Sequence, residues 1–118
     1  MSHPIALTIA GSDSGGGAGI QADLKTFSAL RVYGASVITA ITAQNTRTVA
    51  AVEAVSPAMI GAQLDAVFGD LDIRAVKIGM VGGPEAIAVV AERLAAFLAN
   101  DPVPVVLDPV SYTHLTLP

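Results

Sequence analysis

Short apolar runs alternate with longer amphipathic segments along the chain. Five runs rich in aliphatic or β-branched residues predict buried strands, at residues 5–10, 36–42, 49–55, 75–78 and 103–107. We expect the run at 49–55 to lie nearer a sheet edge than the others.

Between these runs, apolar residues recur at helical spacing in three segments. The predicted apolar faces are Ile20, Leu24, Phe27 and Leu30; Ile60, Leu64, Val67 and Leu71; and Ile87, Val90, Leu94 and Phe97. Strands alternating with such helices predict an α/β fold with a mostly parallel sheet and right-handed crossovers.

The helix ends carry local signals. We expect the first helix to stop near Gly34, where glycine takes a left-handed cap. Ser56 is suited to cap the second helix, with Pro57 in its first position, and the third is predicted to open at residues 83–85.

Four loops that follow predicted strands have unusual compositions. They are residues 11–19, rich in glycine; 43–46, with two amides; 79–83, with further glycines; and 108–109, Asp-Pro. In a parallel sheet, ligands bind beyond the carboxyl ends of the strands. We therefore expect these loops to form the rim of one site.

The amino-acid composition limits the class of protein. The 118 residues are 53% hydrophobic and 14% charged, which predicts one globular unit, and no apolar run is long enough to span a membrane. The start lacks the pattern of a secretory signal, so we expect a cytoplasmic protein. Without cysteine there is no disulfide or thiolate metal site, and with a net charge of -4 we expect no nucleic-acid partner.

The loop at residues 11–19 departs from two nucleotide-binding motifs. A P-loop requires lysine where Gly17 stands, and the dinucleotide fingerprint fails at Ile20. Two interpretations remain: a flexible turn without a ligand, or backbone amides at a helix N-terminus that surround an anionic or polar ligand.

Asp23 lies between Phe27 and Leu30 on a helical wheel, inside the arc that should face the protein. An unpaired buried carboxylate is costly. Its partner is therefore either the helix N-terminus or a group in the pocket.

Three further residues lie on the predicted rim. The Gln44 amide both donates and accepts, which matches a heterocycle with an amino group next to a ring nitrogen, whereas Asn45 better fits an Asx-type turn. Met80 is either plain core or a side chain packed on a flat ring. Asp108 is either a turn former before Pro109 or an acid near a phosphate-bound cation.

Several of these segments together resemble one enzyme family. They are LTIAGSDSGGGAG at 7–19, IQADLKTF at 20–27, VYG at 32–34, TAITAQNT at 39–46, KIGM at 77–80 and DPV at 108–110. In this order and spacing, over about residues 4–110, the chain resembles the N-terminal half of bacterial hydroxymethylpyrimidine/phosphomethylpyrimidine kinases of the ribokinase-like superfamily.

The resemblance implies a ribokinase-like fold, truncated about halfway, and ATP- and Mg²⁺-dependent phosphorylation of 4-amino-5-hydroxymethyl-2-methylpyrimidine and its monophosphate in thiamine biosynthesis. It also implies a homodimer. The implied substrate-binding residues are Gln44, Asp23, Gly11, Ala18 and Met80. Asp108 is implied to lie near the phosphates and the metal ion.

Two departures from the family pattern stand out. Gly15 replaces a usual serine, and residues 111–118, including His114, resemble translated adapter sequence rather than a kinase segment. We therefore expect residues 1–110 to be the N-terminal part of a kinase domain that lacks the catalytic base and most ATP-binding elements. Such a chain should be inactive and marginally folded.

Two alternative functions stay open. A pyridoxal kinase phosphorylates the hydroxymethyl group of a related ring, although Gln44 favours the aminopyrimidine. A non-catalytic pyrimidine-binding module is the other alternative. The prediction on which the rest depends is that Asp23 and the Gln44 amide converge on one cavity above the sheet.

Overall fold

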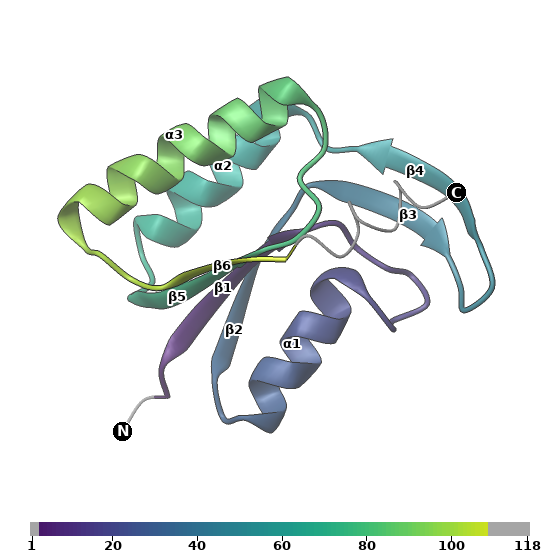
Figure 1. Ribbon diagram of the computed structural model, residues 1–118, viewed down its shortest axis with the longest axis horizontal. Coiled ribbons are helices and arrows are strands. Elements are labelled where there is room, and N and C mark those ends of the chain that lie inside the picture. The colour runs from purple at the N-terminus through teal and green to yellow at the C-terminus, as the bar shows by residue number, and fades with distance from the viewer. Residues whose placement is uncertain (1–2, 109–118) are drawn as a thin grey trace.

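The computed structural model describes residues 3–108, which form a parallel sheet with helices on both faces and a projecting hairpin (Figure 1). The strands are β1 (Ile5–Ala10), β2 (Tyr33–Ile38), β3 (Ala40–Gln44), β4 (Val49–Ala54), β5 (Ile73–Ile78) and β6 (Val105–Leu107). The helices are α1 (Gly19–Ala29), α2 (Pro57–Phe68) and α3 (Pro84–Asn100).

The main sheet has the order β2-β1-β5-β6, and all its pairs are parallel. This confirms the predicted α/β class. β3 and β4 form a separate antiparallel pair in which β4 is exposed along its whole length, as expected for a strand near an edge.

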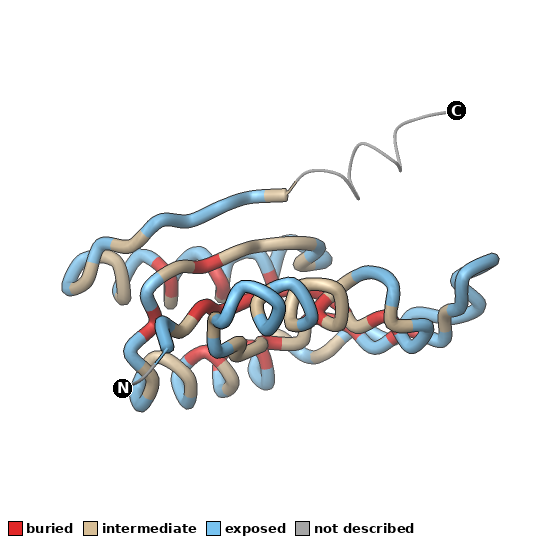
Figure 2. The backbone as a smooth tube through the Cα atoms, turned by 90° about the horizontal axis from the view of Figure 1, so that it is seen from below, coloured by how far each residue is buried: buried red, intermediate tan, exposed pale blue. Residues whose placement is uncertain are grey.

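The two faces of the main sheet differ in character. Successive residues of a strand point to opposite faces: Leu7 and Ile9 belong to the fully buried core with residues of α2 and α3, whereas Thr8 bonds to a side chain of α1. Figure 2 shows the buried residues gathered in the central layers. The apolar core therefore lies under α2 and α3, and the face under α1 carries polar groups.

The predicted strand at 36–42 was wrong as a single element. Thr39 is buried between β2 and β3: its N–H donates to the Ala10 carbonyl at 2.9 Å and its hydroxyl to the Met80 carbonyl at 2.7 Å. The first bond continues the pairing with β1 by one residue and the second ties Thr39 to the 79–83 loop. The chain leaves the main sheet after this residue, although its β-branched residues continue without a break.

The predicted end of the first helix was also wrong. The helix ends at Ala29 with Leu30 as its C-cap, and Arg31 takes the left-handed conformation with φ of 61°. Gly34 lies inside β2, where an added Cβ would be 2.6 Å from Leu24 Cδ2 and 3.0 Å from Phe27 Cδ2. Glycine there allows α1 to approach the sheet.

The starts of the other helices follow the local signals. The Ser56 hydroxyl accepts a hydrogen bond from the Met59 N–H at 3.1 Å, and Gly83 precedes Pro84 at the start of α3. Two predicted core positions are instead exposed, Leu30 at 69% and Ile87 at 53%, and Ala86 is the buried residue at the start of α3. Within residues 3–108, none of the helices has the length and apolar character needed to cross a bilayer.

Candidate functional site

The glycine-rich loop between β1 and α1 is organised by its own carboxylate. Asp13 is 4% exposed and accepts hydrogen bonds from the backbone N–H groups of Gly15, Gly17 and Ala18 at 2.8–2.9 Å. Its own N–H donates to Gln21 Oε1 at 2.7 Å. Three amides that could otherwise face an anion are therefore already satisfied, and the loop is ordered by its own hydrogen bonds.

The start of the loop is closed onto α1. The Ile20 N–H donates to the Gly11 carbonyl at 3.0 Å. Gly19 has φ of 59°, and an added Cβ would lie 2.4 Å from that same carbonyl oxygen. Only glycine fits this position, because both the backbone conformation and the backbone contact exclude a side chain.

The other side of the loop is bonded to β3. The Thr42 hydroxyl donates to the Ser12 carbonyl at 2.8 Å, and the Ser14 hydroxyl both donates to the Gln44 carbonyl and accepts from the Gln44 N–H at 2.6 Å. These contacts fix the end of β3 against the loop, so two of the four predicted rim loops lie side by side.

A third rim loop contacts the first. An added Cβ at Gly11 would lie 3.1 Å from the Met80 methyl group and 3.7 Å from the Ala40 carbonyl oxygen. Met80 is 38% exposed, so its side chain covers Gly11 while keeping an accessible surface. The Gln44 side-chain amide finds no hydrogen-bond partner within residues 3–108.

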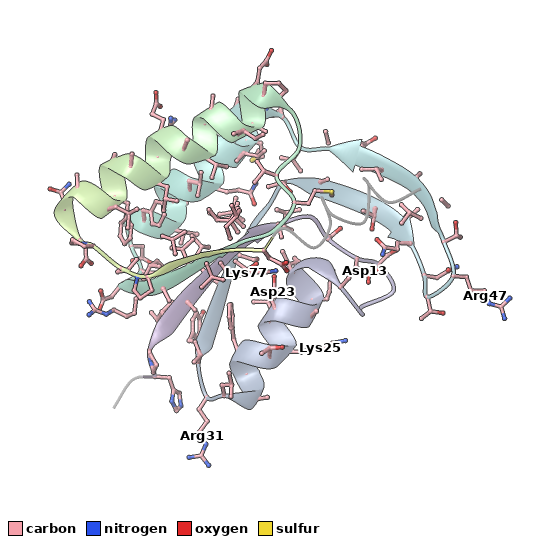
Figure 3. The ribbon with its side chains drawn as sticks, viewed as in Figure 1. Asp13, Asp23, Lys25, Arg31, Arg47 and Lys77 are labelled. Atoms are coloured by element: carbon pink, nitrogen blue, oxygen red, sulfur yellow. The ribbon has the colours of Figure 1, made fainter. Side chains whose placement is uncertain are left out.

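Charged groups gather on the α1 face of the sheet (Figure 3). The Lys77 ammonium of β5 donates to both carboxylate oxygens of Asp23 at 3.0 Å, and the Thr8 hydroxyl donates to Asp23 Oδ2 at 2.6 Å. Asp108, just after β6, forms an ion pair with Lys77 at 3.6 Å. This contact brings the fourth rim loop to the same edge.

Asp23 thus has a partner that the helical wheel did not identify. Neither the helix N-terminus nor a ligand is needed to compensate its charge, because Lys77 and Thr8 do so from the sheet. Lys77 opens the KIGM segment at the end of a predicted strand, two residues before Gly79, and this place was the available signal. Asp13 was missed because a loop acid next to glycines is a common turn former.

The predicted site residues therefore form two groups. Gly11, Ala18, Gln44 and Met80 border the 11–19 loop, whereas Asp23 and Asp108 share Lys77. Convergence of Asp23 and the Gln44 amide on one cavity stays a prediction. Pro109, Val110 and the predicted tail at 111–118 lie outside the described residues.

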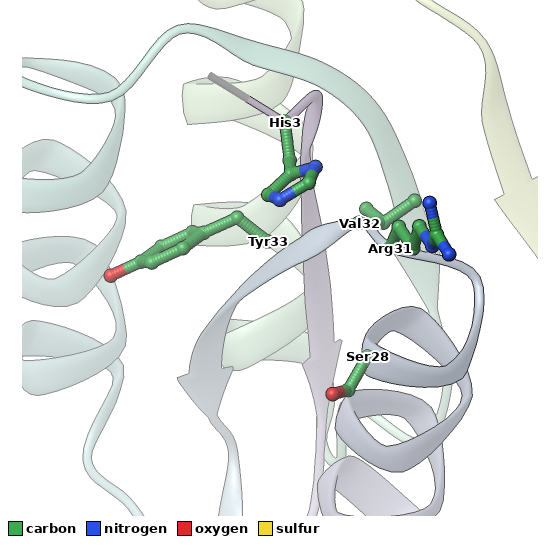
Figure 4. Close-up of a pocket in the computed structure, with 5 residues that line it drawn as sticks. All are labelled: His3, Ser28, Arg31, Val32 and Tyr33. Carbon is green, nitrogen blue, oxygen red and sulfur yellow. The ribbon is translucent and has the colours of Figure 1, made fainter. Parts of the chain in front are cut away.

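Two further features bear on the choice of site. No cluster of three or more potential metal-ligating His, Cys, Asp or Glu side chains occurs within residues 3–108. An open hollow of about 490 Å³ lies at the opposite end of the sheet, lined by His3, Ser28, Arg31, Val32 and Tyr33 (Figure 4). The Arg31 and Tyr33 side chains point away from each other there, so these two polar groups do not converge as they would in a ligand site.

Comparison with known proteins gives consistent matches. The family model described as phosphomethylpyrimidine kinase matches residues 13–115. A hydroxymethylpyrimidine/phosphomethylpyrimidine kinase of Rhizobium meliloti is 69% identical over 106 residues, which are 90% of this chain and 38% of that protein. The corresponding Escherichia coli protein is 56% identical, with 89% and 38% coverage.

Solved structures agree on the fold. A phosphomethylpyrimidine kinase from Clostridium difficile superposes with a TM-score of 0.84 at 59% identity, over 91% of this chain and 45% of that one. A pyridoxal kinase from Staphylococcus aureus, solved in complex with pyridoxal, gives 0.80 at 35% identity, over 92% and 39%. The fold is therefore ribokinase-like, and the chain spans about two fifths of the length of the curated relatives it matches.

Proposed function

Because the chain belongs to the phosphomethylpyrimidine kinase family, we propose that the complete protein phosphorylates 4-amino-5-hydroxymethyl-2-methylpyrimidine and then its monophosphate, with ATP, in thiamine biosynthesis. Residues 3–108 supply most of the wall of the pyrimidine pocket. The observation that carries this assignment to the site is the saturation of the loop amides by Asp13. A wall in which the Gly15, Gly17 and Ala18 donors are already taken suits an uncharged ring better than a phosphate.

In this proposal the ring lies among Gly11, Ala18, Gln44 and Met80. The Gln44 amide has no partner in the described part of the chain, so its carbonyl is available to accept from the ring amino group and its NH₂ to donate to the adjacent ring nitrogen. The exposed part of Met80 packs on the ring face. Asp23 contributes to the wall while held by Thr8 and Lys77.

The described residues supply only part of a magnesium site. Mg²⁺ is usually held by one or two carboxylates together with substrate phosphates, and Asp108 offers one carboxylate at a strand end beside Lys77. When bound, Mg²⁺ with ATP neutralises charge on the transferring phosphoryl group. We propose Asp108 as its single protein ligand from this part of the chain.

The 118-residue chain alone should turn over neither substrate. Phosphoryl transfer also needs a held nucleotide and a base for the attacking hydroxyl, and the site residues within 3–108 provide neither. A purified 118-residue chain that converts the aminopyrimidine in the presence of ATP and Mg²⁺ would contradict this part of the proposal.

The function is tested with the full-length protein and two substrates. We expect kcat/KM for the aminopyrimidine to exceed that for pyridoxal by at least about 100-fold, because a site built around an amide pair rejects a ring without the amino group. Gln44→Ala should lower kcat/KM for the aminopyrimidine about 100-fold and change that for pyridoxal less than about threefold. Steady-state kinetics with both rings measures both ratios.

Two results would count against the assignment. Preference for pyridoxal would indicate the alternative kinase, and equal losses with both rings in Gln44→Ala would remove Gln44 from ring recognition. Tight binding of the aminopyrimidine by full-length protein without any phosphorylation would support a non-catalytic module instead.

A further inference from the structure

Lys77 is the point where three elements of the α1 face meet. Its ammonium contacts Asp23 of α1 at 3.0 Å and Asp108 after β6 at 3.6 Å, and Lys77 itself belongs to β5. The side chains of Lys77 and Asp23 are 23% and 15% exposed. A lysine this enclosed, between two carboxylates, has a local role that an exposed surface lysine lacks.

The two carboxylates reach Lys77 from different elements. Asp23 lies on a helix and has a second donor in the Thr8 hydroxyl at 2.6 Å, so its position does not depend on Lys77 alone. Asp108 follows a strand of three exposed residues, and its side chain is 37% exposed. Its N–H donates to the Ile78 carbonyl at 2.9 Å, which holds the end of β6 beside the end of β5 and places the Asp108 carboxylate next to Lys77.

The neighbouring backbone leaves room for this arrangement. Gly79 follows the end of β5, and an added Cβ there would lie 3.5 Å from Lys77 Nζ and 3.0 Å from the Ala10 Cβ. The distance to Nζ would be an ordinary contact, so Lys77 has room at this end of β5, and the close contact with Ala10 accounts for the glycine.

We propose that Lys77 is a positioning residue for the phosphoryl-transfer step, acting through Asp108. Its positive charge orients the Asp108 carboxylate toward the phosphate end of the site. It also offsets the electrostatic repulsion between the carboxylates of Asp23 and Asp108. This inference rests on the proposed kinase function. It assigns to Lys77 a role in turnover rather than in ring binding.

The test is a comparison of Lys77→Met and Lys77→Arg in the full-length protein. We expect Lys77→Met to lower kcat about 100-fold, while the Kd of the aminopyrimidine, measured by calorimetry without ATP, changes less than about fivefold because Thr8 still holds Asp23. Lys77→Arg should restore kcat to within about tenfold of the original. Asp108→Asn supplies the second side of a double-mutant cycle.

The cycle separates positioning from a merely structural role. If Lys77 acts through Asp108, Lys77→Met should lower kcat less than about threefold when Asp108 is already Asn. Additive losses would overturn the proposal, and so would an unchanged kcat in Lys77→Met. Arg74→Met is the matched control, because Arg74 is a cation on the same strand with an exposed ion pair to Asp72, and its kcat should be unchanged.

The test also covers a Lys77 variant that does not fold and a full-length protein that has no kinase activity. If Lys77→Met does not fold, Lys77→Met combined with Asp23→Asn removes one charge of each sign from the enclosed pair, and the same loss of kcat is expected there. Full-length protein without kinase activity would contradict the proposed function. An active protein with normal kcat in the Lys77 variants would contradict only the positioning role.

Discussion

At the scale of single residues, Asp13 shows how the conformation of a loop can be fixed without a bound ligand. Its carboxylate accepts from three backbone N–H groups next to the start of α1, where a bound anion would otherwise be favoured. The wall of the site is thus formed before any substrate arrives. In a glycine-rich segment this rigidity comes from one acid rather than from the glycines.

Removing this acid should therefore destabilise the protein. We expect Asp13→Ala to lower the free energy of unfolding of the full-length protein by about 3 kcal/mol, because it leaves buried donors without acceptors. Urea denaturation measures the change. Asp72→Ala serves as the control, since its side chain is 75% exposed and its ion pair with Arg74 is 3.7 Å long, and it should change stability by less than about 0.5 kcal/mol. Equal effects of the two substitutions would refute the role given to Asp13.

At the scale of elements, Gln63 compensates for the break between β2 and β3. Its side-chain amide donates to the Ile38 carbonyl at 3.0 Å and accepts from the Ile38 N–H at 2.9 Å. A side chain of α2 thus satisfies the last residue of β2, at the point where the chain leaves the main sheet.

Replacing the Gln63 amide should lower the free energy of unfolding by a measurable amount. Gln63→Leu has a similar size but leaves both Ile38 groups unpaired, so we expect the free energy of unfolding to fall by about 2 kcal/mol. Thermal and urea unfolding of the full-length protein checks this. Met59→Gln on the same helix, at an exposed position, should stay within about 0.5 kcal/mol, and an equally small effect at Gln63 would show that water replaces the amide.

Elements were predictable where their signals are local. The cap at Ser56 and the proline at the start of α3 lie within a few residues of the helix ends that they specify, and both helices begin as predicted. The break at Thr39 and the role of Gly34 depend on Met80, Leu24 and other distant residues, so the local sequence pattern did not reveal them. In the site, the wheel indicated that Asp23 faces inward, but its partner Lys77 is 54 residues away.

At the scale of the whole molecule, the sheet is covered unevenly. β6 lies at the edge of the described sheet, and its three residues are exposed: Val105 at 38%, Val106 at 60% and Leu107 at 67%. Unpaired backbone groups and apolar side chains together make such an edge prone to association.

We expect the 118-residue chain by itself to be marginally stable. It should bind a hydrophobic dye such as ANS and show no cooperative thermal transition, because too little apolar surface is buried. We expect further chain to cover β6 in the full-length protein, which should therefore melt cooperatively and bind little dye. Calorimetry measures the thermal transition, and fluorescence measures dye binding, for the 118-residue chain and the full-length protein. A sharp melting transition of the 118-residue chain would show that its core is sufficient.

The alternation along β1 has a consequence for how this protein can change over time. Leu7 and Ile9 serve the apolar core, while Thr8 between them serves the charged cluster. The side chains that support the core and the one that supports the charged cluster therefore lie on opposite faces of the same strand. Randomising positions 7 and 9 should mainly alter the yield of folded protein. Thr8→Val keeps the buried volume and removes the hydrogen bond to Asp23, so it should fold and differ in turnover rather than in ring preference.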